Sequence, residues 1–525
     1  MTGRRNLILT GFMGTGKTSV ARRLAERMGR TFIDMDDEIV TRAGHTIPEI
    51  FSQLGEDAFR HLESGLCADL SQRTDLVIAT GGGCLVNPEN RQVLSRSGLV
   101  ICLDCAPEGI IARLKGSSDR PMLYGDSPEV RVRDLLSQRQ RAYSEIPYHI
   151  DTTDRTIDQV VEAVHLLAEA NPRLWLVRTP VSSYPVHLIP GGLGYAGDLL
   201  AAAHPLCEVA LVSDEHVWPH WGARLQEALS DRGFRVSTIV LPPGEQNKTL
   251  QTVSHLYDRF FASGLGRSGF VVGLGGGVIT DMAGFAAATY MRGVPFVAIP
   301  TSLLGMVDAS VGGKVAVDLP QGKNLVGAFV QPLLVLLDPA VLNSLPENES
   351  RAGMAEIIKA GIIADPELFA MLEPAATRPD LSDLIARALQ VKIDTVEEDP
   401  HERGRRAVLN LGHTFAHAYE VLEGYGLHHG LAVSIGTVRA ALLAEARGIS
   451  SPATTRRIAD AFRAHGLPVD PPPHDPEEVY EAMQADKKKQ GRQLRFVLPT
   501  QIGQVIVVDD VTEVEVIAAL RRETP

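Results

Sequence analysis

Two glycine-rich signatures of ligand binding stand in one chain of 525 residues. The first is Gly11-Phe-Met-Gly-Thr-Gly-Lys-Thr18. The second is Gly275-Gly-Gly-Val-Ile-Thr-Asp281, and a histidine cluster follows it at His413, His417 and His429. Each glycine-rich turn needs its own strand and helix, and a single hydrophobic core stops growing at about 250–300 residues. The sequence therefore predicts several domains and two active sites, as in a bifunctional enzyme.

Composition argues against several classes of protein. The net charge of −13 disfavours binding to nucleic acid, which needs a basic surface. No apolar run reaches the length of about 20 residues that spans a bilayer. The N-terminus leads directly into the strand-like Leu7-Ile-Leu9, which leaves no room for a signal peptide. We expect a cytoplasmic protein with small-molecule substrates and with no nucleic-acid or membrane partner.

The five cysteines do not form a disulfide framework. Cys102-Leu-Asp-Cys105 has C-x-x-C spacing, but Leu99-Val-Ile-Cys-Leu103 has the pattern of a buried strand. No second pair completes a zinc site. The pattern favours Cys102 as a core residue over a metal or redox role.

The first signature has the context that a phosphate-binding loop requires. A strand-like Asn6-Leu-Ile-Leu-Thr10 precedes it, and a segment with helical apolar spacing follows. Backbone N–H groups of the loop would turn toward the phosphates, Lys17 would neutralise the β- and γ-phosphates, and Thr18 would bind Mg²⁺. The expected ATP-binding residues here are Gly14, Thr15, Gly16, Lys17, Thr18 and Ser19.

Two carboxylates are expected beside this loop. Phe32-Ile-Asp-Met-Asp36 reads as a second strand in which Asp34 and Asp36 face one side. One of the two could bind Mg²⁺ through water, and the other could accept a hydroxyl proton. Asp36 could instead cap the following helix, and Gly81-Gly-Gly83 could be no more than a tight turn.

Together these residues resemble the shikimate kinase family from end to end of the region. The likeness rests on the phosphate loop, Asp34-x-Asp36, Phe59-Arg60, Gly81-Gly82-Gly83, Arg120-Pro-Met-Leu and Arg139-x-x-x-Tyr143-x-Glu145. The resemblance implies that shikimate binds to Asp36, Arg60, Gly82 and Arg139, with the arginines holding its carboxylate. It also implies that Arg120 closes over ATP and acts in catalysis with Lys17 and Asp36.

A domain boundary is expected after Asn171-Pro172, which ends a helical segment. We expect a kinase domain over residues 1–170 and a short connecting segment over 171–182 that packs against another element. An α/β nucleotide-binding domain is expected over 183–340, and a mostly helical domain over 341–525. The expected fold class is α/β throughout, beginning with a parallel sheet flanked by helices.

The second signature is a weaker indicator of a dinucleotide site, because its spacing is not G-x-G-x-x-G. Two other features support such a site. Ala210-Leu-Val-Ser-Asp214 reads as a strand that ends in an acid suited to a ribose. Polar, charged and glycine residues alternate between Arg292 and Asn324 and indicate a lined pocket.

A metal site is expected in the helical part of the chain. Glu356 lies one helical turn before Lys359, and His413 and His417 share a helix face. His429 begins the next helix. One carboxylate with two imidazoles is a regular catalytic zinc set, but spacing alone does not select which two histidines bind.

The whole second region resembles the 3-dehydroquinate synthase family, from Tyr184-Pro185 to Asp486-Lys487-Lys488. The resemblance implies zinc, or cobalt, on Glu356, His413 and His429, with His417, Glu402 and Lys314 acting beside the substrate. It places NAD on Asp214, Glu245, Lys248, Gly276, Gly277, Val278, Asp281, Thr301, Ser302 and Lys323. It places the heptulosonate phosphate on Arg292, Asp308, Lys314, Asn324, Lys359, Lys392, Arg406, Asn410 and Lys488. A homodimer through this region is typical of such enzymes.

The sequence departs from the family pattern at His216, Gly269, Ser302, Met306 and Asn348, which leaves the details of the NAD contacts open. Two other interpretations stay open as well. A metal-dependent polyol dehydrogenase also combines an NAD site with a metal site among helices, but it needs no phosphate-binding array. One of the two regions could also be inactive and serve in regulation or assembly.

Overall fold

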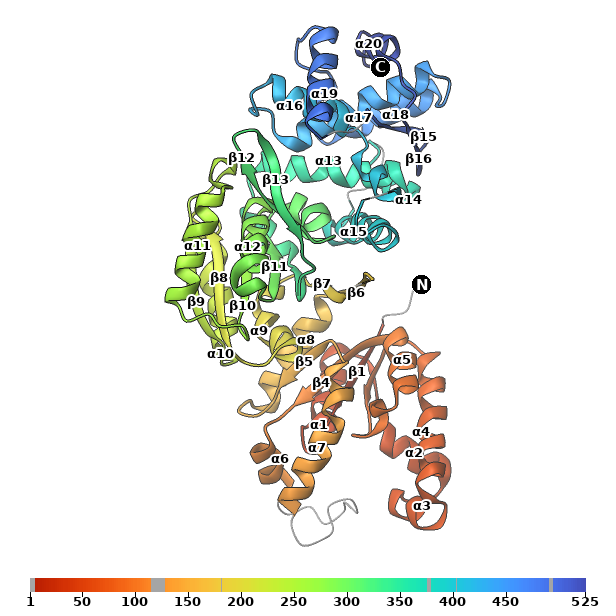
Figure 1. The fold of residues 1–525 in the computed structure, drawn as a ribbon. Helices are drawn as coiled ribbons and strands as arrows, with labels where there is room; N and C mark the ends of the chain where they lie inside the picture. The colour runs from red at the N-terminus through yellow and green to blue at the C-terminus, as the bar shows by residue number, and fades with distance from the viewer. Residues whose placement is uncertain (1–4, 115–127, 181, 375–378, 403, 491–493) are drawn as a thin grey trace. The chain divides into compact units, whose positions relative to one another are not determined.

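The structure is a computed structural model that describes residues 5–114, 128–180, 182–374, 379–402, 404–490 and 494–525. The chain divides into two compact units (Figure 1). Unit 1 comprises residues 1–172 and 195–206, and unit 2 comprises residues 173–194 and 207–525.

Unit 1 is built on a five-stranded parallel sheet with the order β2-β3-β1-β4-β5. Its central strands are buried along their whole length, as expected for a parallel sheet covered by helices. The strands are β1 (Asn6–Gly11), β2 (Thr31–Asp34), β3 (Leu76–Ala79), β4 (Gly98–Asp104) and β5 (Tyr148–Asp151). The helices are α1 (Lys17–Met28), α2 (Met35–Ala43), α3 (Ile47–Gln53), α4 (Gly55–Ser71), α5 (Pro88–Ser97), α6 (Pro107–Leu114), α7 (Pro128–Ser144), α8 (Ile157–Glu169) and α9 (Ala196–Ala203).

Unit 2 begins with a seven-stranded sheet of order β6-β7-β14-β11-β10-β8-β9, in which only β6 is antiparallel to its neighbour. The strands are β6 (Arg173–Arg178), β7 (Ser183–Leu188), β8 (Glu208–Asp214), β9 (Arg235–Leu241), β10 (Phe270–Gly275), β11 (Phe296–Pro300) and β14 (Leu334–Leu337). The helices α10 (Ala223–Asp231), α11 (Leu250–Ala262) and α12 (Gly277–Thr289) alternate with them, and β12 (Lys314–Leu319) pairs with β13 (Gly322–Phe329) as a hairpin.

The rest of unit 2 is mostly helical (Figure 1). It comprises α13 (Glu347–Ile363), α14 (Pro366–Ala370), α15 (Leu381–Glu398), α16 (His413–Leu422), α17 (His429–Ala446), α18 (Pro452–Ala464), α19 (Pro476–Gln490), a hairpin of β15 (Phe496–Gln501) and β16 (Gln504–Val508), and α20 (Glu513–Leu520). Helix α17 is mostly apolar and almost wholly buried, which makes it the centre of this layer. The expected α/β fold class, with a parallel sheet first and helices last, is confirmed.

Two segments lie elsewhere than the sequence suggested. Residues 173–178, expected in the connecting segment, form the edge strand β6, where Trp175 Nε1 donates to Gln390 Oε1 at 2.7 Å. Residues 195–206, expected in the nucleotide-binding domain, group with unit 1. There Tyr195 donates its hydroxyl to Ala163 O at 3.4 Å. Short segments next to a boundary carry no strong periodicity, so tertiary contacts decide where they pack.

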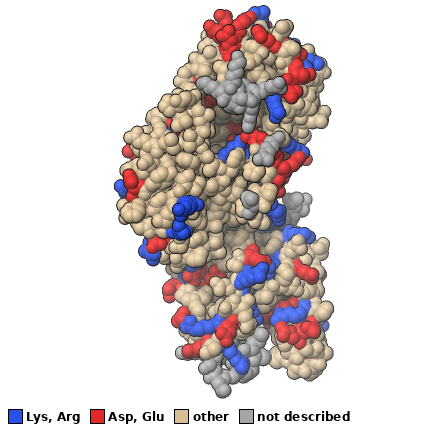
Figure 2. All heavy atoms as spheres, in the orientation of Figure 1, with Lys and Arg blue, Asp and Glu red and all other residues tan. Residues whose placement is uncertain are grey.

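Charge is distributed over the surface. Acidic and basic side chains lie close to one another on the face shown in Figure 2. Among the helices that the structure describes, none combines the length and the apolar character needed to cross a membrane.

Candidate active sites

The phosphate loop of unit 1 joins β1 to α1, as the sequence predicted. Gly14 and Gly16 have positive φ angles of 82° and 92°, which a side chain would strain. Gly16 is the N-cap of α1, so the free N–H groups of the first helical turn face the loop. Lys17 Nζ donates to Phe12 O at 2.9 Å, and Thr18 Oγ1 donates to Asp34 Oδ2 at 2.8 Å. The loop therefore brings an ammonium, a hydroxyl and a carboxylate together at the end of β1.

The expectation that Asp34 and Asp36 both lie on a strand is wrong for Asp36. Strand β2 ends at Asp34, whose Oδ1 accepts a hydrogen bond from Asp36 N at 3.0 Å. Asp34 is thus the N-cap of α2, and Asp36 lies in the first turn of that helix. Capping by a carboxylate ends the strand two residues earlier than the alternation of side chains alone would suggest.

The loop Gly81–Gly83 collects the other residues that were expected to bind shikimate. Arg139 Nη1 donates to Gly82 O at 3.2 Å. A Cβ added at Gly81 would lie 2.8 Å from Asp36 Oδ1, and one at Gly83 would lie 3.0 Å from Arg60 Nη1. The absence of side chains on this loop therefore lets one carboxylate and two guanidinium groups approach a common space.

Glu63 also belongs to this group, although it was not among the residues expected from the sequence. It lies on α4 with Arg60, 2% exposed, and its Oε2 accepts from Arg60 Nη1 at 2.6 Å. Burial raises the pKa of Glu63, although the ion pair with Arg60 opposes the shift. The spacing Arg60-x-x-Glu63 on one helix face is the signal that would have found it. Arg120, expected to close over ATP, lies outside the described residues.

A large cavity lies in unit 2 between the carboxyl ends of its parallel strands and the helical layer. Its volume is about 2710 Å³. Every residue expected to bind NAD lines it: Asp214, Glu245, Lys248, Gly276, Gly277, Val278, Asp281, Thr301, Ser302 and Lys323. Three of these residues mark the ends of strands: Asp214 is the last residue of β8, Gly276 follows β10, and Thr301 follows β11. Ligands of open parallel sheets bind at this edge.

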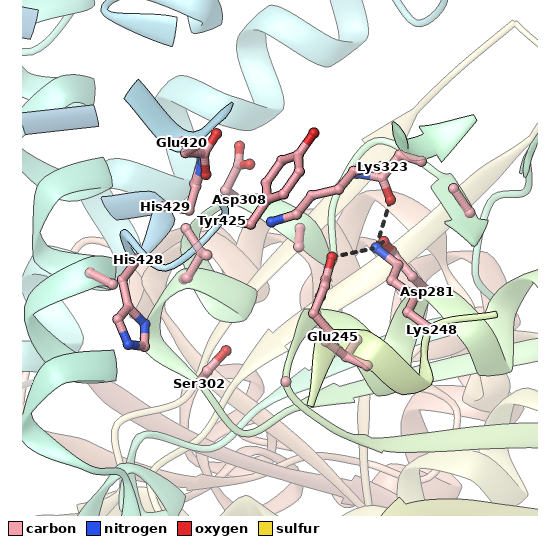
Figure 3. Close-up of a pocket in the computed structure, with 18 of the residues that line it drawn as sticks. Glu245, Lys248, Asp281, Ser302, Asp308, Lys323, Glu420, Tyr425, His428 and His429 are labelled. Atoms are coloured by element: carbon pink, nitrogen blue, oxygen red, sulfur yellow. Dashed lines mark hydrogen bonds and ion pairs between the residues drawn. The ribbon is translucent and has the colours of Figure 1, made fainter. Parts of the chain in front are cut away.

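A polar network joins the side chains of this part of the cavity (Figure 3). Lys248, 4% exposed, donates to Asp281 Oδ2 and to Asn324 Oδ1, both at 2.6 Å. Burial raises the pKa of Asp281 to about 6, although Lys248 opposes the shift. Lys323 Nζ lies 4.9 Å from the centre of the Tyr425 ring. Asn324, expected in the substrate set, thus contacts a lysine expected in the NAD set, so the two sets are adjacent.

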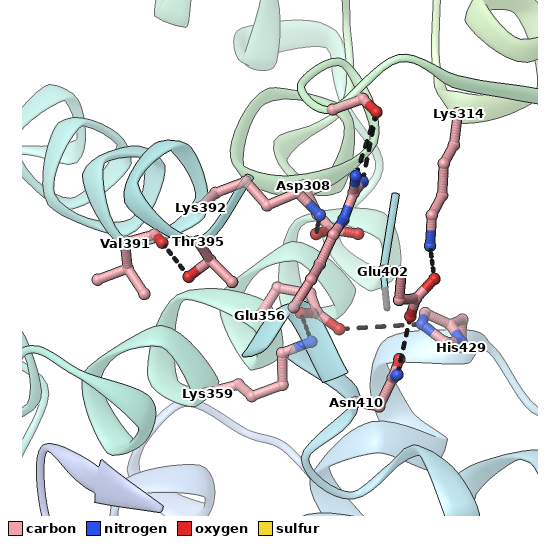
Figure 4. Close-up of polar contacts among 12 residues, drawn as sticks. Asp308, Lys314, Glu356, Lys359, Val391, Lys392, Thr395, Glu402, Asn410 and His429 are labelled. Carbon is pink, nitrogen blue, oxygen red and sulfur yellow. Dashed lines mark hydrogen bonds and ion pairs between the residues drawn. The ribbon is translucent and has the colours of Figure 1, made fainter. Parts of the chain in front are cut away.

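Three ligand-type side chains from three helices meet beside the cavity. Glu356 of α13, His413 of α16 and His429 of α17 each offer a ligand atom, and these atoms lie within 4.8 Å of one another. Glu356 Oε1 is buried, accepts no hydrogen bond and lies 3.8 Å from His429 Nε2 (Figure 4). Glu356 Oε2 forms an ion pair with Lys359. His417 also lines the cavity, with its ring centre 5.6 Å from that of His413, but it is not a member of this set.

The surroundings of the two histidines differ. Burial lowers the pKa of His413, and Lys359 adds to the effect, so this imidazole is neutral and has a lone pair to offer. His429 Nδ1 lies 3.2 Å from Glu420 Oε1. Such a carboxylate contact fixes the orientation of a ligating histidine and leaves Nε2 free for the ligand bond. Glu420 was not selected from the sequence, although the spacing His413-x-x-x-His417-x-x-Glu420 places all three on one face of α16.

Buried cations surround the same region (Figure 4). Lys359, Lys392 and Arg406 are 3%, 8% and 2% exposed. Burial alone would raise the pKa of Asp308, but its ion pair with Lys392 and the nearby Lys359 bring it well below its usual value. Arg406 donates to the carbonyl oxygens of Pro400 (2.8 Å) and Gly312 (3.3 Å). Its guanidinium is therefore held by neutral acceptors and retains the capacity to bind an anion.

Glu402 connects the hairpin β12–β13 to the helical layer. It pairs with Lys314 of β12 and accepts from Asn410 Nδ2 at 3.0 Å (Figure 4). Burial alone would raise the pKa of Glu402, but Lys314 and Asn410 lower it overall, so the carboxylate is ionised at neutral pH. Glu402, Lys314 and Asn410 all line the cavity.

Several residues expected to bind the substrate do not line the cavity. Arg292 is exposed and does not line it. The side chain of Lys488 lies outside the described part of the chain. Lys359, Lys392 and Arg406 do not line the cavity either. Lys392 pairs with Asp308 and Glu356 faces His429, and both Asp308 and His429 line it, while Lys359 pairs with Glu356.

The fold and the sites define a P-loop phosphotransferase unit followed by an α/β unit with a carboxylate–histidine cluster. The family model for shikimate kinase matches residues 13–168. The models for the N-terminal and C-terminal parts of 3-dehydroquinate synthase match residues 238–352 and 353–489.

Individual proteins agree with these family models. The 3-dehydroquinate synthase of Synechocystis sp. is 45% identical over 353 residues, which cover 65% of this chain and 98% of that protein. That of Desulforamulus reducens is 44% identical over 346 residues, covering 64% and 96%. The solved structure of 2-epi-5-epi-valiolone synthase from Streptomyces hygroscopicus, with NAD⁺ and Zn²⁺ bound, is 32% identical with a TM-score of 0.60 and covers 65% and 96%. The chain belongs to the 3-dehydroquinate synthase family, carries a shikimate kinase region before it, and is a bifunctional enzyme of the shikimate pathway.

Proposed function

We propose that unit 1 transfers the γ-phosphoryl group of ATP to shikimate and that unit 2 converts 3-deoxy-D-arabino-heptulosonate 7-phosphate to 3-dehydroquinate and phosphate. The cofactors would be Mg²⁺ with ATP in unit 1, and NAD with Zn²⁺ or Co²⁺ in unit 2. The observation that carries the proposal is the assembly, in each unit, of the residues that this chemistry needs.

In unit 1 the phosphate loop and the Gly81–Gly83 loop supply the two halves of the site. Lys17 would neutralise phosphate charge, while Thr18 and Asp34, already joined by a hydrogen bond, would hold Mg²⁺ directly and through water. Asp36 would orient the shikimate hydroxyl and accept its proton. Arg60 and Arg139 would hold the carboxylate of shikimate, for which the planar guanidinium group is suited.

In unit 2 the cluster of Glu356, His413 and His429 fits a catalytic divalent metal. Glu356 Oε1 is buried and accepts no hydrogen bond, so a cation would satisfy it, and three protein ligands leave a position for substrate. When bound, the metal would polarise the substrate hydroxyl while NAD takes up a hydride and later returns it. The relative from Streptomyces hygroscopicus was solved with these cofactors.

The chain's own residues would direct the elimination of phosphate. Lys392, Arg406 and Lys359 lie buried around Asp308 and would stabilise the negative charge of the leaving phosphate. Glu402, ionised and held by Lys314 and Asn410, would take part in proton transfer, as would His417, which lines the same cavity. Ring opening and an intramolecular aldol step would then close the carbocycle. A homodimer through unit 2 is part of the proposal, and light scattering on the purified chain tests it.

The synthase assignment is tested by following phosphate and NADH together. Purified chain is supplied with the heptulosonate phosphate, a divalent metal and much less NAD than substrate. We expect release of phosphate far beyond the amount of NAD, with no net NADH, and loss of the activity after treatment with a chelator. NADH in proportion to turnover, or oxidation of a simple polyol, would instead support a dehydrogenase.

Replacing Glu420 by glutamine is expected to weaken metal binding without unfolding the chain. Glutamine keeps the size of the side chain, but it removes the charge that holds His429 Nδ1. Loss of such an outer contact lowers metal affinity by about 10- to 100-fold. Competition with a chromophoric chelator measures this affinity. Glu423→Gln at the C-cap of the same helix, whose carboxylate pairs with His474, is the matched control and should leave the affinity unchanged.

Replacing Gly430 by alanine is expected to displace the metal cluster. A Cβ at Gly430 would overlap the backbone of Ala352, where α17 crosses α13. These two helices carry His429 and Glu356, so separating them moves two proposed ligands apart. Overpacking of this kind costs about 1–3 kcal/mol, which thermal unfolding measures, and metal affinity should fall with it.

Gly448→Ala, where a Cβ meets open space but φ is 66°, controls for backbone strain alone. Equal metal affinity in both variants would contradict the account of the helix crossing.

A further inference from the structure

Unit 1 holds a thiol, a carboxylate and an imidazole that the proposed kinase reaction does not use. Cys102 and Asp104 lie on β4, and His149 lies opposite Cys102 on the neighbouring strand β5. Asp104 Oδ1 accepts from Cys102 Sγ at 3.5 Å, and Asp104 Oδ2 lies 2.8 Å from His149 Nδ1. One ligand-type atom from each residue lies within 4.8 Å of the others.

This cluster combines burial with one accessible side. Cys102 is 0% exposed and His149 is 9% exposed, but the Asp104 side chain is 38% exposed. An ion could therefore reach the cluster at the carboxylate. Within the described part of the chain, the only other set of this kind is Glu356, His413 and His429 in unit 2.

The imidazole of His149 is oriented as a metal ligand would be. Its Nε2 lies 2.8 Å from Ile146 O, and because a carbonyl only accepts, Nε2 carries a proton and donates it. A backbone carbonyl on the far nitrogen is a usual outer contact of a ligating histidine, and it leaves Nδ1 directed at the cluster. Nδ1 lies 2.8 Å from Asp104 Oδ2 and faces the carboxylate.

Each of the three side chains can supply one ligand atom to a divalent ion. Cys102 Sγ donates to Asp104 Oδ1 in the metal-free form, so an ion would displace the thiol proton to solvent and bind the thiolate. Asp104 and His149 would supply a carboxylate oxygen and Nδ1.

The distances are close to those of a tetrahedral site. With bonds of about 2.0–2.3 Å, neighbouring ligand atoms around zinc lie about 3.3–3.8 Å apart. The separation of 3.5 Å between Cys102 Sγ and Asp104 Oδ1 already falls in this range. The contact between His149 and Asp104 would lengthen by about 0.5 Å as an ion replaces the shared proton.

We propose that Cys102, Asp104 and His149 bind a second divalent ion of the zinc class, between the carboxyl end of β4 and the neighbouring strand β5, with a fourth position open to water. A thiolate and an imidazole select zinc or cobalt over Mg²⁺, which prefers oxygen ligands. The ion would therefore not compete with the Mg²⁺ proposed at Thr18 and Asp34. The C-x-x-C spacing of Cys102 and Cys105 gave no guide to this site, because the third ligand comes from the neighbouring strand and Cys105 is not a member.

The site would lie close to the phosphate loop. Asp104 O accepts from Thr152 N at 2.8 Å, and Arg113 donates to Thr152 Oγ1 at 3.0 Å and to Gly14 O at 3.4 Å. Arg113 thus contacts both Thr152, directly after β5, and the phosphate loop. An ion that joins β4 to β5 would therefore hold in place a segment that is hydrogen-bonded to Arg113. We expect the ion to raise the thermal unfolding temperature of unit 1.

Cobalt titration of the full-length, metal-free chain tests the proposal. A cobalt–thiolate bond gives an intense near-ultraviolet charge-transfer band, and the cluster in unit 2 has no sulfur ligand, so the band reports the new site alone. We expect the band to reach saturation when one sulfur-bound ion is present per chain. This expectation holds whether or not the proposed metal of unit 2 binds. Absence of the band in the wild-type chain would overturn the proposal.

Variants assign the band to its ligands. Cys102→Ser and His149→Asn are each expected to lose the band and one bound ion per chain, while Cys105→Ser retains both. Kinase activity with Mg²⁺ and circular dichroism establish that each variant is folded. A band that persists in Cys102→Ser, or one that disappears only in Cys105→Ser, would contradict the assignment.

Discussion

Replacing Glu356 by glutamine is expected to reduce the synthase activity by about three orders of magnitude and to leave the kinase activity unchanged. Glutamine has nearly the size of glutamate, but it lacks the charge that pairs with Lys359 and the anionic oxygen that faces His429. Loss of a metal ligand removes several kcal/mol of charge stabilisation in the transition state. Each 1.36 kcal/mol corresponds to a tenfold change in rate, so the expected loss is about three orders of magnitude. Phosphate release from the heptulosonate phosphate measures the effect.

The matched control for this change is Glu347→Gln. Glu347 lies on the same helix α13 but is exposed and pairs with Arg351. Its replacement should leave phosphate release and metal content unchanged. If Glu356→Gln kept full activity and bound metal normally, the proposed ligand set would be wrong. If it lost the kinase activity as well, general unfolding rather than loss of the metal would be the cause.

Replacing Lys17 by methionine is expected to reduce the kinase activity by about three orders of magnitude while the synthase activity stays at its wild-type level. Lys17 is the cation of the phosphate loop and lies at the start of α1, with its ammonium held at Phe12 O. Methionine keeps the length of the side chain but removes the charge that would stabilise the transferring phosphoryl group. Formation of ADP that depends on shikimate measures the effect.

Arg23→Ala controls for the loss of a cation from the same helix. Arg23 lies on the exposed side of α1 and pairs with Asp158, so its removal is expected to change the kinase rate by less than about twofold. Full kinase activity in Lys17→Met would contradict the assignment of the phosphate loop.

Local sequence patterns predicted the parts of both sites that one segment builds alone. The turns after β1 and β10 are strand, glycines and helix, and each is fixed by residues adjacent in the chain. The same holds for His413 and His417, which share a face of α16 because of helical periodicity. Asp36 was misplaced on a strand because its neighbour Asp34 caps the next helix, and capping competes with alternation over single residues.

Features that depend on contacts between distant segments could not be derived from periodicity. Glu356, His413 and His429 come from three helices, so their selection rested on family resemblance, and the structure brings their ligand atoms together. Glu63 and Glu420 were missed because their partners identify them only in the folded chain. The link between Cys102 and His149 depends on the register of β4 against β5, which no local pattern encodes.

The most direct test of the account is to measure both reactions on one preparation of the purified wild-type chain. The account predicts that the same chain converts shikimate and ATP to shikimate 3-phosphate and ADP, and releases phosphate from the heptulosonate phosphate with catalytic NAD and a divalent metal. It also predicts that a chelator selective for zinc over magnesium stops only the second reaction. Failure of the chain to catalyse either reaction with its full set of cofactors would contradict the claim that it carries two active sites.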